Sequence, residues 1–212
     1  GMEIEIAVRK FDVPHEFNLL TMNQAESIPN EVEFKDLKGR MDLRDVPFVT
    51  IDGEDARDFD DAVYCTPSAD TKGGWRLLVA IADVSHYVLP GTPIDQEATK
   101  RGTSVYFPRR VIPMLPEKLS NGLCSLNPGV DRLVLVCDMV IGPKGAMKAY
   151  QFYNAVIHSA ARLTYNQVWD ALTDPQSMAA KAMGQLYGDV ENLYTLFKML
   201  FESRQRRGAM EI

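Results

Sequence analysis

The densest group of residues able to perform chemistry is an acidic segment, TIDGEDARDFDDA, at residues 50–62. Its six carboxylates are Asp52, Glu54, Asp55, Asp58, Asp60 and Asp61. So many like charges on one short segment are unfavourable unless water or a cation compensates them. Carboxylate oxygens are also the ligands that Mg²⁺ and Mn²⁺ prefer. The segment therefore predicts either a divalent-metal site or a solvated acidic loop, and the residue types alone leave both interpretations open.

Two apolar runs must position this segment, at residues 48–51 before it and 62–65 after it. Runs of this kind are typical of strands anchored in a core. In an extended chain, Asp58 and Asp60 point to one side and Asp61 points to the other. This arrangement favours a fixed carboxylate cluster over a freely solvated loop.

The turn that would complete the cluster is at Gly53, which allows the backbone to bring Asp52 back towards the other aspartates. A calcium-binding EF-hand is a poor fit to the segment, because Arg57 occupies the position where that loop needs glycine.

The remaining sequence predicts strands followed by helices. Residues 3–11 alternate in polarity and predict a strand, residues 15–27 have helical content, and residues 28–47 form a Pro-, Gly- and charge-rich connection. Further strands are expected in FVTI, DDAVYC, WRLLVAIADV, RLVLVCDMVI and MKAYQFYNAVIHSA. A short helix is expected at 94–100, and the Gly-Pro-Lys-Gly sequence at 142–145 favours a hairpin turn.

From Thr164 onward the pattern is helical. One apolar stripe is formed by Ala182, Leu186, Val190, Leu193, Phe197 and Leu200. If this stripe lacks a cover, we expect self-association through the C-terminal helix. The predicted fold class is α+β, with a mixed, largely antiparallel sheet and flanking helices.

Composition narrows the class of protein. The chain has 212 residues and a net charge of −6, which argues against an independent nucleic-acid-binding module but not against an RNA enzyme that concentrates its acids around metal ions. No apolar run is long enough to span a bilayer, so no membrane association is expected. Cys65, Cys124 and Cys137 match no zinc spacing, and reduced thiols in a cytoplasmic protein are the simplest account of them.

The acidic segment also lies within a longer motif, DLRDVPFVTIDGEDARDFDDAVYC, that closely resembles the signature of the RNB family of exoribonucleases. The likeness continues through GGWRLLVAIADVSHYV, RGTSVYFPRRVIPMLPEKLSNGLCSLNP and SAARLTYNQVW, and is greatest to the ribonuclease R branch. The resemblance implies a metal-dependent enzyme that degrades single-stranded RNA from its 3′ end and releases nucleoside 5′-monophosphates.

The resemblance also assigns individual residues. The four metal-site aspartates of the family match Asp52, Asp58, Asp60 and Asp61, and Asp60 matches the one most closely tied to catalysis. The implied cofactor is Mg²⁺, with Mn²⁺ as the other possibility. Tyr106 and Tyr165 match family tyrosines that contact the RNA near its 3′ end. Stacking on aromatic rings holds single-stranded RNA with little dependence on sequence.

Residues 1–41 resemble a connector of one strand and one helix, and residues 42–212 resemble part of an RNB catalytic domain. The sequence lacks the arginine-rich HFTSPIRRY-like motif of the family, so the resemblance implies weak or no exonuclease activity for this chain alone. The alternative is a non-catalytic metal- or RNA-binding module derived from the same fold.

Overall fold

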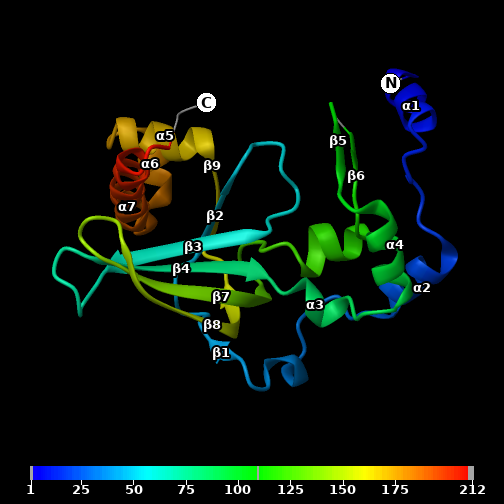
Figure 1. Cartoon of the computed structure of the whole chain (residues 1–212), viewed down its shortest axis with the longest axis horizontal. Coiled ribbons are helices and arrows are strands. Elements are labelled where there is room, and N and C mark those ends of the chain that lie inside the picture. Colours follow the sequence, from blue (N-terminus) through cyan, green and yellow to red (C-terminus); the bar gives the residue numbers. More distant parts are fainter. Residues whose placement is uncertain (1, 109, 210–212) are drawn as a thin grey trace.

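The fold is built around a seven-stranded sheet with the strand order β1-β8-β7-β4-β3-β2-β9 (Figure 1). The computed structural model describes residues 2–108 and 110–209. Its strands are β1 Met41–Asp42, β2 Val49–Asp52, β3 Asp61–Pro67, β4 Trp75–Ala82, β7 Asp131–Ile141, β8 Met147–His158 and β9 Ala161–Thr164. The two outermost pairs, β1–β8 and β2–β9, are parallel, and the other pairs are antiparallel. The predicted α+β class with a largely antiparallel sheet is confirmed.

A separate hairpin, β5 Val105–Phe107 and β6 Arg110–Ile112, projects beside the sheet (Figure 1). The helices are α1 Met2–Lys10, α2 Leu19–Ser27, α3 Val84–Tyr87, α4 Pro93–Arg101, α5 Tyr165–Thr173, α6 Met178–Met183 and α7 Leu186–Arg206, with a 3₁₀ turn η1 Phe34–Leu37 and a π-helical segment η2 Lys118–Leu123. Helices α5–α7 gather at one end of the sheet, and α2–α4 lie at the other (Figure 1).

The β7–β8 hairpin illustrates how the sequence determines a turn. Gly145 has φ of +77°, a conformation that favours glycine, and its amide donates to the Gly142 carbonyl at 2.9 Å. A Cβ on Gly145 would stand 2.9 Å from the Cβ of Ser203 in α7. The predicted Gly-Pro-Lys-Gly turn is therefore confirmed, and glycine is also required there because the turn packs against α7.

Alternation along the strands divides the core into two sides. One side contains Ala62, Ala80 and Val136, which pack with residues of α4 and η2. The opposite side contains Val49 and Cys65, which pack against the helices α5–α7. The sheet is therefore a middle layer, with helices packed against both of its faces.

Helix α7 packs this way through much of the predicted apolar stripe. Val190, Leu193 and Leu200 face the sheet, together with Leu196, which the stripe did not include. Most of the stripe is therefore covered within the chain, and Ala182 lies apart from it in α6, which ends at Met183. Phe197 remains exposed, and self-association through α7 stays a prediction.

The strand predicted at residues 3–11 is wrong, because this segment forms the helix α1. Alternation over a few residues cannot distinguish a strand from a short helix. Glu3 and Glu5 lie in the first turn and Arg9 and Lys10 in the last, which suits the helix dipole. Glu5 also accepts a bond from Arg110 in the β5–β6 hairpin at 2.6 Å, so side chains rather than a strand partner attach the segment.

A buried ion pair within α4 also holds the segment that precedes the sheet. Arg101 Nε donates to Glu97 Oε1 at 3.1 Å, and the two side chains are 2% and 9% exposed. The Arg101 guanidinium also lies 3.7 Å from the centre of the Phe17 ring and donates to the Glu16 carbonyl at 2.8 Å. Asn18, the N-cap of α2, donates to Glu97 at 3.3 Å. One arginine therefore joins α4 to the chain that precedes α2.

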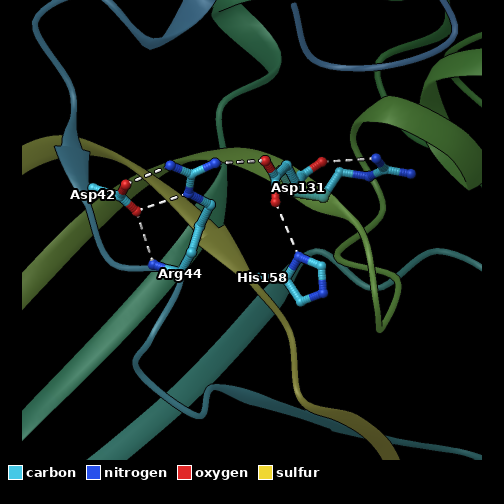
Figure 2. Close-up of polar contacts among 5 residues, drawn as sticks. Asp42, Arg44, Asp131 and His158 are labelled. Atoms are coloured by element: carbon cyan, nitrogen blue, oxygen red, sulfur yellow. Dashed lines mark hydrogen bonds and ion pairs between the residues drawn. The ribbon is translucent and has the colours of Figure 1, made fainter. Parts of the chain in front are cut away.

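A second polar network fixes the edge strand β1 (Figure 2). Arg44 donates to Asp42 at 2.5 Å and to Asp131 at 3.2 Å, and His158 Nδ1 lies 2.9 Å from the other Asp131 oxygen. Hydrogen bonds from Arg44 lower the pKa of Asp42 to about 2. The network joins β1 to the start of β7 and the end of β8.

A third polar group lies on the sheet itself. Asp138 in β7 is buried, and it accepts bonds from Arg76 at 2.6 and 2.9 Å, from Gln151 at 3.2 Å and from Tyr153 at 3.2 Å. The bonds from Arg76 are the main cause that lowers the pKa of Asp138.

In the described part of the chain, no helix is both long enough and apolar enough to cross a membrane.

Replacing Arg101 with methionine should destabilise the chain by about 3 to 5 kcal/mol, because Glu97 would remain buried without its cation. Urea unfolding measures the change. The matched control is Arg206→Met, since Arg206 pairs with Glu202 at an exposed site and its loss should cost less than about 1 kcal/mol. Equal losses in the two variants would contradict the structural role of Arg101.

Replacing Asp138 with asparagine should cost about 1 to 3 kcal/mol at neutral pH, because charged hydrogen bonds are lost. The folded pKa of Asp138 is depressed, so its contribution is present above roughly pH 4 and is lost as pH falls through the folded pKa. Unfolding curves from about pH 7 down to about pH 3 should therefore show the two proteins converging. A difference that stays constant over this range would refute the linkage, and Asp70→Asn, at an exposed position, serves as the control.

Candidate metal centre

The acidic segment forms the loop between β2 and β3, with an aspartate at each end. Asp52 is the last residue of β2, and Asp61 is the first residue of β3. Asp58 and Asp60 lie between them, separated by Phe59, whose side chain is buried in the core. Because neighbouring side chains of an extended chain point in opposite directions, burial of Phe59 turns Asp58 and Asp60 outwards together.

The four aspartates are close enough to repel one another. Burial raises the pKa of Asp60, and the negative charges of Asp58, Asp61 and Asp52 raise it further. Burial and then Asp52 likewise raise the pKa of Asp61. The structure thus brings together the four residues that the sequence selected, although they span ten positions of the loop and its flanks.

The described residues place no ion pair on this charge. Within residues 2–108 and 110–209, none of the ion pairs involves any of the four aspartates. In the same residues, no three His, Cys, Asp or Glu side chains already converge as a preformed metal cage. The donors themselves are hard carboxylate oxygens on a fixed frame, and this donor set fits Mg²⁺ or Mn²⁺.

Tyr106 reaches the cluster from the β5–β6 hairpin. Its hydroxyl donates to Asp58 Oδ2 at 3.1 Å, and its side chain remains 65% exposed. Burial, followed by the charge of Asp58, raises the pKa of Tyr106. The hairpin therefore presents an aromatic ring to solvent directly beside the aspartates.

Tyr165 is placed on another side of the loop by the parallel pairing of β2 with β9. Asp52 is the register partner of Thr164, and Tyr165 follows as the first residue of α5. The Thr164 side chain caps this helix by accepting from the Gln167 amide at 3.2 Å. Tyr165 is 61% exposed, so both predicted RNA-contacting tyrosines present open rings next to the acidic loop.

Sequence reasoning missed the residues that brace the loop. Arg162 in β9 donates to the carbonyls of Glu54 and Ala56 at 2.8 and 3.2 Å, and its guanidinium lies 4.8 Å from the centre of the Phe59 ring. Asn166 donates to the Glu54 carboxylate at 2.8 Å. Glu54 is therefore both exposed and bound. The bonds to backbone carbonyls leave no signal in the sequence.

Comparison with known proteins identifies the family of the chain. The model of the RNB domain family matches residues 40–212. Ribonuclease R of Escherichia coli is 53% identical over 210 residues, which cover 99% of this chain and 26% of that protein. Ribonuclease R of Acidithiobacillus ferrooxidans is 46% identical, over 100% of this chain and 47% of that protein. The chain thus spans a quarter to a half of the length of these relatives.

Solved structures give the same result. The chain is similar to Mycoplasma genitalium RNase R in complex with ribose-methylated single-stranded RNA, with a TM-score of 0.89 and 32% identity, over 99% of this chain and 32% of that one. The complex of the same enzyme with double-stranded RNA matches equally well, over 36% of its chain. On its sequence, its fold and these matches, the chain belongs to the RNB family and has the fold of ribonuclease R.

Proposed function

We propose that this chain is the metal-binding part of a 3′→5′ exoribonuclease catalytic domain that hydrolyses single-stranded RNA and releases nucleoside 5′-monophosphates. The observation that carries the proposal is the mutual repulsion of four carboxylates in the β2–β3 loop and at its two ends, none of which forms an ion pair in the described residues. Membership of the RNB family supports the same chemistry. On this assignment, residues 1–41 are a connector and residues 42–212 are part of the catalytic domain.

The aspartates Asp52, Asp58, Asp60 and Asp61 would hold Mg²⁺ or Mn²⁺, and Asp60 is the catalytic one. When bound, such ions supply an activated water and neutralise charge on the phosphoryl oxygens. Asp60 suits the central role, because the other three all act on its carboxylate. Tyr106 orients Asp58 through its hydroxyl.

The two exposed tyrosines, Tyr106 and Tyr165, would stack on bases near the 3′ end of the RNA. They lie beside opposite parts of the acidic loop, next to Asp58 and Asp52. The related RNase R complex holds single-stranded RNA, which supports this class of ligand. The three cysteines are free thiols, and this supports a place in the reducing cytoplasm.

Titration of the chain with Mn²⁺ by calorimetry tests the proposal. The unaltered chain should bind, and Asp60→Asn should bind at least roughly tenfold more weakly, because a central ligand is lost. Asp55→Asn is the matched control, since Asp55 lies on the same loop but outside the four, and its affinity should stay unchanged. Equal binding by Asp60→Asn, or no binding by any of the proteins, would contradict the site.

Repulsion within the site should also cost stability when no divalent ion is bound. With EDTA present at neutral pH, Asp60→Asn should unfold at a higher urea concentration than the unaltered chain. The reason is the raised folded pKa of Asp60: the ionised carboxylate destabilises the fold above the pKa of the unfolded chain, and this penalty disappears as pH falls. Asp55→Asn should show little change. A clear loss of stability in Asp60→Asn would show that the carboxylates do not repel one another.

A further inference from the structure

The backbone between Asp58 and Asp60 is fixed by a segment far away in the sequence. The Phe59 amide donates to the Ser125 hydroxyl at 3.0 Å. The Phe59 carbonyl accepts from the Leu126 amide at 2.8 Å. Both backbone polar groups of Phe59, the one residue between the two aspartates, are therefore bound by two consecutive residues.

Further bonds extend this restraint on either side. The Ser125 hydroxyl is 3.5 Å from the Arg57 carbonyl, which it faces as a donor, and the Asp60 carbonyl accepts from the Ala82 amide at 2.9 Å. Ser125 is 0% exposed, so water cannot replace its hydroxyl. Among the groups that restrain the backbone of Asp58 and Asp60, the Ser125 hydroxyl is the buried side-chain group.

Ser125 is held in turn by Arg132. Arg132 Nε donates to the Ser125 carbonyl at 2.8 Å, and Nη1 donates to the Asp131 carbonyl at 2.9 Å. The arginine is 8% exposed and forms no ion pair with a carboxylate in the described part of the chain. Burying an unpaired cation is costly, so its position needs a reason other than charge pairing. Bonds from a planar guanidinium to two carbonyls orient the Ser125 backbone firmly.

We propose that Ser125 and Arg132 are positioning residues of the metal centre, which set the spacing of Asp58 and Asp60 through the backbone of Phe59. This inference rests on the proposed metal site and goes beyond the assignment of its ligands. Neither residue is one of the four proposed ligands. They act by fixing the backbone that carries two of the proposed ligands, Asp58 and Asp60.

Loss of the Ser125 hydroxyl would leave the Phe59 amide buried without an acceptor. A buried donor without a partner costs free energy, and the loop can relieve this cost only by moving Phe59 towards water. Such a movement also rotates Asp58 and Asp60. The structure therefore predicts a loss of metal affinity that is larger than the loss expected from lower stability alone.

The experiment compares Ser125→Ala with Ser159→Ala. Ser159 is also buried, and its hydroxyl bonds at 3.4 Å to the Phe48 and Ala161 carbonyls, not to the acidic loop. With both variants shown to be folded by circular dichroism, Mn²⁺ affinity is measured by calorimetry. Ser125→Ala should bind at least roughly tenfold more weakly than the unaltered chain, whereas Ser159→Ala should bind equally well.

Hydrogen exchange gives a readout that needs no metal. In Ser125→Ala the Phe59 amide should exchange faster than in the unaltered chain, while amides in the central strands β4 and β7 keep their protection. A second pair, Arg132→Met and Arg132→Lys, tests the guanidinium. Lysine restores one N–H donor, so it should recover part of the Mn²⁺ affinity that methionine loses.

The outcomes separate this inference from the proposed function. If the unaltered chain and Ser125→Ala bind Mn²⁺ equally well, the positioning role is overturned and the metal site stands. Equal losses in Ser125→Ala and Ser159→Ala also overturn it, since both would then act only through stability. If the unaltered chain binds no Mn²⁺, the metal site fails and the inference fails with it.

Discussion

Repulsion among the carboxylates of the β2–β3 loop is the constraint on which the arrangement around the site depends. Without packing contacts, a loop with this charge would extend into water, and its carboxylates would move apart. Here Asp52 and Asp61 are fixed because they belong to strands, and Asp58 and Asp60 are fixed because Phe59 between them is buried. Much of the packing around the loop serves to hold these charges near one another.

The strand order explains how a few residues hold the four aspartates near one another. Parallel pairing of β2 with β9 places the start of α5, and with it Tyr165, next to Asp52. The same strand supplies Arg162, which binds carbonyls of the loop. Antiparallel pairing of β3 with β4 carries Ala82 to the Asp60 carbonyl. Arg162, Tyr165 and Ala82 thus reach the loop from β9, from the helix that follows it and from β4, and the two strands belong to the sheet.

Local patterns in the sequence were sufficient to predict the strands that flank the acidic loop. The apolar runs around residues 48–51 and 62–65 correctly indicated anchored strands. The resemblance to the RNB family, not the local pattern, singled out four of the six carboxylates between them, and their role as ligands stays a prediction. The pattern failed at residues 3–11, where a short alternation was compatible with both a helix and a strand. In that segment the outcome depends on charges at the helix ends and on Arg110, which is distant in sequence.

The supports of the loop could not be predicted, for a different physical reason. Ser125 and Arg132 lie more than sixty positions after Phe59 and act on its backbone or on each other. A backbone amide or carbonyl has the same chemistry at every residue, so no side-chain pattern marks which one is bound. Only the folded chain shows that a serine hydroxyl and a guanidinium support an aspartate cluster.

The most direct measurement is anomalous diffraction from crystals of the chain grown or soaked with Mn²⁺. We expect an anomalous peak bounded by carboxylate oxygens of Asp52, Asp58, Asp60 and Asp61, with the Tyr106 and Tyr165 rings open beside it. A peak elsewhere on the surface, or no peak at a concentration that saturates binding in solution, would contradict the central claim that these four aspartates form the metal centre.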